Sequence, residues 1–235
     1  MELEFYGAAG YVTGSCHILR VAGCTVLLDC GLIQGGDKEE AKNADPFPFD
    51  AEAIDAVVLS HAHIDHSGRL PLLVKRGFRG TIHAQTATVA LIRILLADSA
   101  DLENSRIRRK NRRRDERNQP LLEPLYTQED VGTTLSQVRG HAYGESVEVV
   151  PGLSLRFHDA GHIMGSAVVN LQLEEDGVRR TLVFSGDLGQ YDSPILEDPE
   201  SPPAADHIIM ESTYGDRGHR DRAASLDEMG KVFLD

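Results

Sequence analysis

The chain has 235 residues, of which 41% are hydrophobic, enough for one large domain or for one domain and a fragment of another. Its formal net charge of −13 argues against a generic nucleic-acid coat, because such a protein would be basic. No apolar run approaches membrane-spanning length, the start MELEFYG is not a signal peptide, and the three cysteines form no CxxC pair. These features predict a cytoplasmic protein without a membrane partner.

The first predicted elements are a pair of strands and a third strand that follows them. AGYVTGS (9–15) precedes the apolar run CHILRV, a turn, and CTVLLDCG (24–31). A Pro-rich loop then leads to the strand-like run IDAVVL, which ends in SHAHIDHSG (60–68). The small and polar residues of that last stretch predict a loop that enters a helix.

Helical patterns occupy the middle of the chain. They cover LPLLVKRG (70–77), residues 86–117 and TQEDVGTTLSQV (127–138), the last of which opens with a capping-box-like TQED. Within the second pattern, RIRRKNRRRDER (106–117) holds eight Arg/Lys and two acidic residues, a local charge of +6. A solvated helix face and a strip that contacts phosphates are equal alternatives for this run.

The second half of the chain repeats the pattern of the first. AGHIMGS (160–166) precedes AVVNLQL, the turn EEDG and TLVFSGDLG (181–189), and a Pro-rich loop again leads to a strand, DHIIM. β-Hairpins resemble one another by chance because their turns favour Gly and Asp. The number of correspondences in the same order favours a duplication, and strand pairs alternating with helices predict an α/β layer architecture of two packed sheets with outer helices.

Four candidate metal ligands fall within six consecutive positions: His61, His63, Asp65 and His66. A histidine cluster can be a tag or a low-complexity tract, but this one is internal and follows a strand-like run. Neutral imidazoles with a carboxylate suit Zn²⁺ or a similar ion, and a structural zinc site is disfavoured because no cysteine pair is present. The second repeat adds His162 and Asp187, each of which alone would be interpreted as a turn or capping residue.

These motifs resemble those of a known family. HAHIDH, DAGHIMGS, FSGDLG and LLDCG resemble the metallo-β-lactamase superfamily, and ESTYGDR (211–217), GLIQGG and EPLYTQED are similar to its β-CASP nuclease branch, which includes ribonuclease J and the endonucleases of mRNA 3′-end processing. The resemblance covers essentially the whole chain. It implies an αββα metallo-β-lactamase sandwich that is incomplete at the C-terminus, with residues 1–214 as the core and 215–235 as the truncated first helix of a β-CASP cap.

The resemblance also implies a centre of two zinc ions, with manganese as an alternative metal. It assigns His61, His63 and His162 to one ion. Asp65 and His66 are assigned to the other ion, and Asp187 bridges the two. Asp29 would order the ligand loop, although a plain turn aspartate is an equal alternative. Glu211 matches an acid that orients a catalytic histidine of the cap, and it is grouped with Asp65 and Asp187 as catalytic. His17 has no assigned role and is expected in the core or on the surface.

The activity that the resemblance implies is hydrolysis of RNA phosphodiester bonds by a hydroxide that bridges the two metals, in RNA processing or decay. Arg112, Arg113 and Arg114 would then contact the RNA. A thioester or lactone hydrolase of the same superfamily, and a non-catalytic scaffold subunit, are the alternatives. Family members continue into segments that supply a general-acid histidine and a further metal-binding histidine. We therefore expect the 235-residue chain to bind its second metal weakly, to cleave RNA weakly or not at all, and to self-associate or to bind a partner chain.

Overall fold

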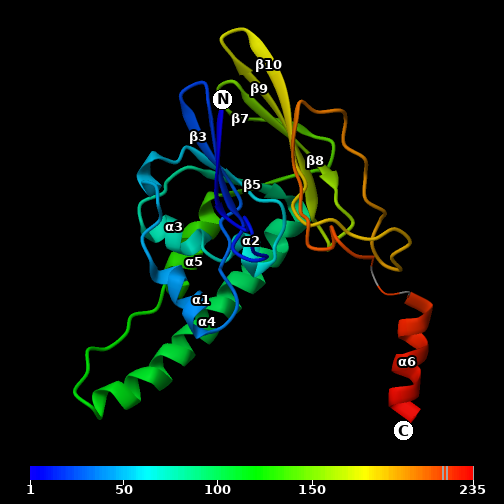
Figure 1. The fold of residues 1–235 in the computed structure, drawn as a ribbon. Helices are drawn as coiled ribbons and strands as arrows, with labels where there is room; N and C mark the ends of the chain where they lie inside the picture. Colours follow the sequence, from blue (N-terminus) through cyan, green and yellow to red (C-terminus); the bar gives the residue numbers. More distant parts are fainter. Residues whose placement is uncertain (219, 221, 235) are drawn as a thin grey trace.

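Two β-sheets pack face to face in the computed structural model, which describes residues 1–218, 220 and 222–234 (Figure 1). The first sheet contains six strands in sequence order: β1 (Glu2–Gly7), β2 (Cys16–Val21), β3 (Cys24–Leu28), β4 (Ala56–Val58), β5 (Thr81–Gln85) and β6 (Val138–His141). The second contains five strands, in the order β11 (His207–Ile209), β10 (Val178–Phe184), β9 (Ala167–Glu175), β8 (Leu153–Asp159) and β7 (Ser146–Val150). This arrangement confirms the predicted α/β sandwich.

The helices lie mainly beside the first sheet. They are α1 (Asp37–Ala41), α2 (Ile64–Ser67), α3 (Leu70–Lys75), α4 (Thr86–Asp115), α5 (Gln128–Gln137) and α6 (Arg222–Leu234), with 3₁₀ turns η1 (Lys42–Ala44) and η2 (Ala51–Ala53). The three helical patterns predicted in the middle of the chain are thus confirmed as α3, α4 and α5. Thr127 caps α5 in a reciprocal capping box with Asp130, as TQED predicts.

Alternation of side chains along the strands builds two hydrophobic cores. In β2, Ile18 packs with the helices while its neighbour Leu19 packs against the second sheet. Phe157 of β8 and Phe184 of β10 face Leu19 from the other side of this inter-sheet core. Since both faces of the first sheet are covered, β4 and the last three residues of β3 are buried and apolar rather than alternating with polar residues.

The two predicted repeats have the same strand connections. In each, an antiparallel hairpin is followed by a strand that pairs in parallel with the second strand of the hairpin: β2–β3 with β4, and β9–β10 with β11. The carboxyl ends of β3 and β4 therefore lie at one edge of their sheet, and those of β8, β10 and β11 lie at one edge of the other. The loops that leave these strand ends carry most of the candidate ligands.

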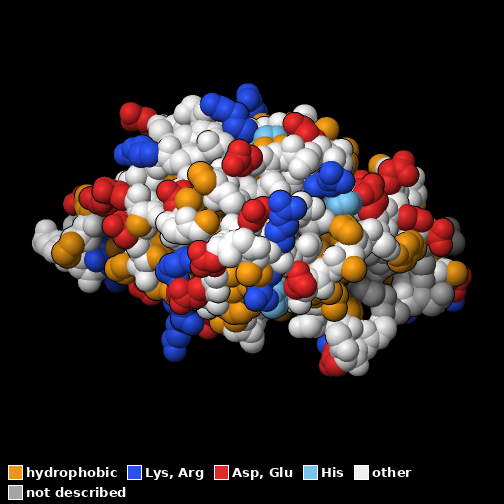
Figure 2. Space-filling view, turned by 90° about the horizontal axis from the view of Figure 1, so that it is seen from above, with side chains coloured by type: hydrophobic (Ala, Val, Ile, Leu, Met, Phe, Trp, Pro, Cys, Tyr) orange, Lys and Arg blue, Asp and Glu red, His pale blue; other side chains and the backbone are white. Residues whose placement is uncertain are grey.

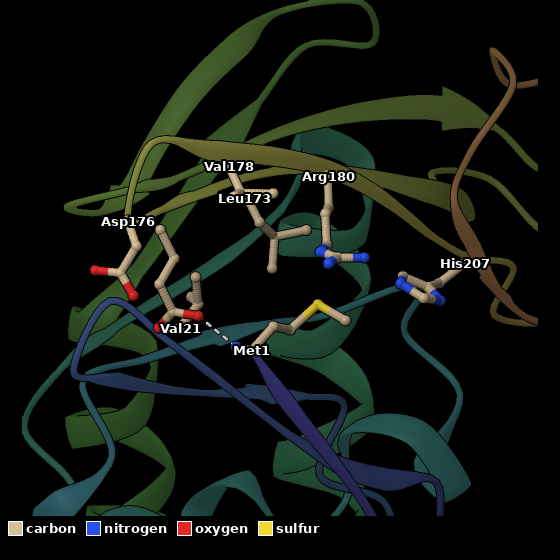
Figure 3. Close-up of a pocket in the computed structure, with 8 residues that line it drawn as sticks. Met1, Val21, Leu173, Asp176, Val178, Arg180 and His207 are labelled. Carbon is tan, nitrogen blue, oxygen red and sulfur yellow. Dashed lines mark hydrogen bonds and ion pairs between the residues drawn. The ribbon is translucent and has the colours of Figure 1, made fainter.

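The opposite end of the β10 strand borders a pocket of about 420 Å³. Figure 3 shows Met1 lying below Leu173 and Arg180, with His207 at the side; its dashed line marks the ion pair between the terminal amine and Glu175. Arg180 and Asp187 are seven residues apart on and after an extended strand, roughly 20 Å. This pocket is therefore distinct from the cluster of candidate ligands.

Two helices extend away from the sheets. Helix α4 has 30 residues, about 45 Å at 1.5 Å per residue, and its far half reaches beyond the body of the molecule (Figure 1). Helix α6 lies apart from both sheets in the same view, as the predicted helix near the end of the chain. Among the described residues, no helix is both long and apolar enough to cross a membrane.

Candidate metal centre

The histidine motif lies at the point where β4 leaves the first sheet. The strand ends at Val58, His61 and His63 lie in the short loop after it, and α2 begins at Ile64. The predicted loop entering a helix is therefore confirmed. The loop is fixed by backbone hydrogen bonds from the amides of Cys30 and Leu32, which reach the carbonyls of His66 and Ile64. His61 and the end of the motif, His66 and Ser67, are buried, and only the middle residues 63–65 are partly exposed.

Four side chains from three loops converge, two from this motif and one from each of two other loops. Donor atoms of His61, His63, His162 and Asp187 all lie within 4.8 Å of one another. The Nδ1 atom of His63 is 3.1 Å from Nε2 of His61 and 3.2 Å from Nε2 of His162. Asp187 Oδ2 is 3.7 Å from the first of those Nε2 atoms and 3.6 Å from the second. The structure thus brings together residues that are up to about 125 positions apart in the sequence.

The spacing of these atoms fits one small cation. Two nitrogen donors at about 2.1 Å from a tetrahedral Zn²⁺ lie about 3.4 Å from each other. Four of the six separations among these atoms are 3.1–3.7 Å, which brackets that value, and all six are within 4.8 Å. Three imidazoles and a carboxylate are also a donor set typical of a borderline divalent ion, so the residues present fit the expected metal.

Asp187 faces two groups at once. While Oδ2 faces the three-histidine group, Oδ1 lies 3.2 Å from Nε2 of His66. That same Nε2 atom is 3.7 Å from a carboxylate oxygen of Asp65. Asp65 and His66 therefore form a second, smaller group of donors on the other side of Asp187. This is the placement that a bridging carboxylate requires.

Asp29 supports the second group from the protein interior. It is fully buried and accepts hydrogen bonds from the Ser15 hydroxyl at 3.0 Å and from the amide and hydroxyl of Ser60 at 2.8 and 2.9 Å. Its Oδ2 atom is also 2.7 Å from Nδ1 of His66. A carboxylate on one imidazole nitrogen fixes the ring and leaves the other nitrogen for a cation. These contacts favour the ordering role over a plain turn aspartate.

Burial and charge set the protonation of the histidines. The pKa of His61 is well below its usual value, first because the side chain is buried and then because His66 is close. Burial, and next His162, also lower the pKa of His63. Both rings are therefore neutral at pH 7, which is the form that binds a cation.

The His66–Asp187 pair has the opposite balance. Burial alone would lower the pKa of His66, but the carboxylates of Asp29 and Asp187 outweigh it and raise this pKa to about 10. Burial would likewise raise the pKa of Asp187, yet its contact with His66 and the nearby histidines lower it to about 2. Cation binding at His66 accordingly competes with a proton.

Two serines that sequence reasoning did not single out also support the site. Ser15 donates to Asp29, and the hydroxyl of Ser166 accepts the backbone N–H groups of His162 and Ile163 at 3.1 and 3.2 Å. Both serines end the AGxxxGS motif of their repeat. The repeated motif was therefore a signal for them, since each copy stabilises the loop that carries or supports a ligand.

The glycines of the two D-x-G motifs explain the close contact of the loops. An added Cβ at Gly31 would lie 1.6 Å from the carbonyl oxygen of Asp65, and one at Gly189 would lie 1.7 Å from that of Gly161. Only glycine leaves room for these approaches. Each D-x-G thus places its aspartate, Asp29 or Asp187, against the loop of the histidines that it contacts.

Glu211 lies next to the Asp187 loop. Its Oε1 atom accepts the backbone N–H of Leu188 at 2.7 Å, and its own amide donates to the Ser185 hydroxyl at 3.1 Å. Glu211 therefore links the end of β11 to the residues that flank Asp187 on both sides.

The arginine run is remote from this cluster. Thr88, near the start of α4, donates to the carbonyl of Gly165 in the His162 loop at 2.7 Å. Arg113 lies 25 residues further along the helix, roughly 40 Å away. Arg112 and Arg113 are exposed, and on the face shown in Figure 2 basic and acidic side chains are interspersed. The predicted RNA contact of this run stays a prediction.

The comparison with protein families gives the class of the protein. The family model described as "Metallo-beta-lactamase superfamily" matches residues 9–228, so the chain belongs to this superfamily. Membership of this superfamily, which the motifs predict, is thereby confirmed.

The curated relatives are longer proteins with nuclease or termination-factor names. Ribonuclease TTHA0252 of Thermus thermophilus is 46% identical over 233 residues, which cover 99% of this chain and 48% of the relative. Transcription termination factor FttA of Methanothermobacter thermautotrophicus is 35% identical, covering 99% and 34%, and endoribonuclease YSH1 of Gibberella zeae is 30% identical, covering 93% and 25%. The chain thus spans half or less of the length of these relatives, whose names agree with the predicted nuclease branch.

Proposed function

We propose that the protein is a metal-dependent ribonuclease of the β-CASP branch, acting on RNA phosphodiester bonds. The observation that carries this proposal is the convergence of His61, His63, His162 and Asp187, whose donor atoms all lie within 4.8 Å of one another. The relative named as a ribonuclease, 46% identical across nearly the whole chain, supports RNA over a small thioester or lactone as the substrate.

Each residue of the site would have a separate role in binding the cations or in positioning their ligands. His61, His63, His162 and Asp187 would hold a first cation, and Asp65 and His66 would hold a second one together with Asp187. Bound cations supply stabilisation of negative charge on phosphate oxygens and lower the pKa of an attacking water. Asp29 keeps the His66 ring in position through Nδ1, and Ser166 keeps the His162 loop in place.

The two positions should differ in affinity. The first has three imidazoles and one carboxylate oxygen, all within 4.8 Å, whereas the second has one imidazole, Asp65 and the other oxygen of Asp187. Because each additional donor adds a direct bond to the cation, we expect the first position to bind zinc more tightly than the second. Manganese would compete best at the second, where oxygen donors predominate.

The domain division is part of the same proposal. Residues 1–214 would form the metallo-β-lactamase core, and residues 215–235, which include α6, would begin the cap. The position of α6 away from both sheets supports this division (Figure 1).

The test pairs metal analysis with RNA cleavage. Asp187→Ala should lower bound zinc at both positions and abolish cleavage of a single-stranded RNA, whereas Asp65→Asn should lower only the weaker one. Asp101→Ala, which removes an exposed carboxylate on α4, is the control and should change neither. Cleavage of a thioester but not of RNA by the zinc-loaded protein would replace the proposed substrate. Full zinc content in Asp187→Ala would overturn the proposed site.

A further inference from the structure

A groove of about 520 Å³ opens beside the second group of ligands. It begins at Asp65, His66 and Asp187 and runs between two walls. One wall is the AGYVTGS loop of the first repeat, and the other is the end of β11 with the ESTYGDR segment that follows it. Its volume falls in the range of about 300–1,000 Å³ that is typical of small-molecule sites.

His17 lies on the floor of this groove and has an unused polar atom. The side chain is 4% exposed, and its Nδ1 atom is buried with no hydrogen-bond partner among the described residues. The edges of the Phe5 and Phe184 rings hold the imidazole in place, with centroids 5.2 and 5.6 Å away. Buried polar groups normally have a partner, so this atom indicates a hydroxyl or a bound water that enters through the groove.

The walls supply exposed apolar side chains. Tyr11 on one side is 54% exposed, and Met210 on the other is 66% exposed. The Arg217 guanidinium, which lies over the Tyr214 ring at 5.0 Å, also lines the groove. An exposed aromatic ring such as that of Tyr11 is a typical stacking platform for bases of single-stranded RNA, and an exposed Met side chain adds apolar contact.

We propose that this groove binds the nucleotide next to the scissile phosphate. Its base lies between Tyr11 and Met210, and its ribose faces His17. The inference rests on the proposed ribonuclease function and adds to it the side of the metal centre along which the RNA runs. It follows from the groove and the unpartnered His17 nitrogen, not from the ligand set.

The test is equilibrium binding of adenosine 5′-monophosphate and of inorganic phosphate to the zinc-loaded protein. Adenosine monophosphate should bind more tightly than phosphate, because only it has a base. Tyr11→Ala and Met210→Ala should each weaken its binding about fivefold or more and leave phosphate binding unchanged. Met164→Ala is the matched control: Met164 is 60% exposed in the His162 loop, outside the groove lining, and its loss should have no effect.

Each result separates this inference from the proposed function. If Met210→Ala and Met164→Ala weaken the binding of adenosine monophosphate equally, the groove is not the nucleotide subsite. The same conclusion follows if the nucleotide binds no more tightly than phosphate. If both groove variants bind and cleave RNA with unchanged KM, the inference is wrong and the ribonuclease function stands. If the nucleotide binds in the groove but the zinc-loaded protein hydrolyses a thioester and not RNA, the groove stands and the proposed function is wrong. Thermal melting of each variant checks that it folds.

Discussion

The Nδ1 atom of His66 lies 2.7 Å from a carboxylate oxygen of Asp29, which is fully buried. An imidazole ring has only two nitrogens. Because Nδ1 of His66 contacts Asp29, Nε2 is the nitrogen that faces the ligand cluster. The backbone of Asp29 is in the left-handed region, with φ of 59°, so the chain holds a strained residue at this position to make the contact.

Asp29→Asn should therefore weaken the second cation position selectively. Asparagine tolerates the left-handed conformation, so the backbone is preserved while the carboxylate is lost. We expect a roughly 10–100-fold lower affinity at the position of His66, with little change at the three-histidine position. Calorimetric titration with zinc measures the affinities of both positions. The control is Asp55→Asn, because Asp55 is an exposed carboxylate that accepts the Thr25 amide. Equal weakening of both positions would show that Asp29 acts on the fold as a whole.

Glu211 should affect metal binding through the Leu188 amide. Glu211→Ala removes the acceptor that fixes the Asp187 loop, and we expect about tenfold weaker zinc binding. Glu211→Gln keeps an oxygen at the same place, so it should restore most of the affinity. If the glutamine variant binds zinc as poorly as the alanine variant, the charge of Glu211 matters rather than its hydrogen bond to the loop.

Acid should destabilise the fold through His83 of β5. Its Nδ1 atom is 3.0 Å from Nε2 of His141, and Arg139 is close, while Glu145 lies 3.9 Å from the other nitrogen of His141. Burial, then the charge of His141 and Arg139, lowers the pKa of His83 to about 4 from 6.5. The unfolded chain thus binds the proton more readily, and stability is lost as the pH falls from about 6.5 to 4, by about 3 kcal/mol in full.

Urea unfolding at pH 7, 5 and 4 checks this prediction. His83→Gln removes the titrating group, so its stability should fall less steeply with acid than that of the wild type. His207→Gln, which changes an exposed histidine of β11, is the control. Parallel pH curves for the wild type and His83→Gln would contradict the assignment.

Substrate length should reveal the role of the arginine run. Arg112, Arg113 and Arg114 replaced by Gln should weaken binding of a long single-stranded RNA and reduce its salt slope by about 0.7 for each lost phosphate contact. A dinucleotide held at the metal centre is too short to reach a point roughly 40 Å along α4, so its binding should not change. An unaltered salt slope for the long RNA would leave a solvated helix face as the interpretation of the run.

The sequence predicted the parts of this site that depend on local spacing. HAHIDH after a strand, and His162 and Asp187 in matching loops of a duplication, predicted that distant residues converge once the family resemblance of these motifs was added. The role of Asp29 could not be decided, because it depends on a contact with His66 across 37 positions and on a left-handed backbone. The same holds for Ser15 and Ser166, whose hydroxyls act only once the loops have folded against each other. The distance of the arginines from the site follows from the straightness and length of α4, which a charge pattern does not contain.

The central claim is that three histidines and Asp187 hold a metal ion. Anomalous X-ray diffraction at the zinc absorption edge, on crystals of protein purified with zinc, tests it most directly. The predicted result is a strong peak at about 2.0–2.1 Å from Nε2 of His61, Nδ1 of His63 and Nε2 of His162. A well-ordered structure with no peak at that point, or with its main peak elsewhere, such as between His83 and His141, would contradict the claim.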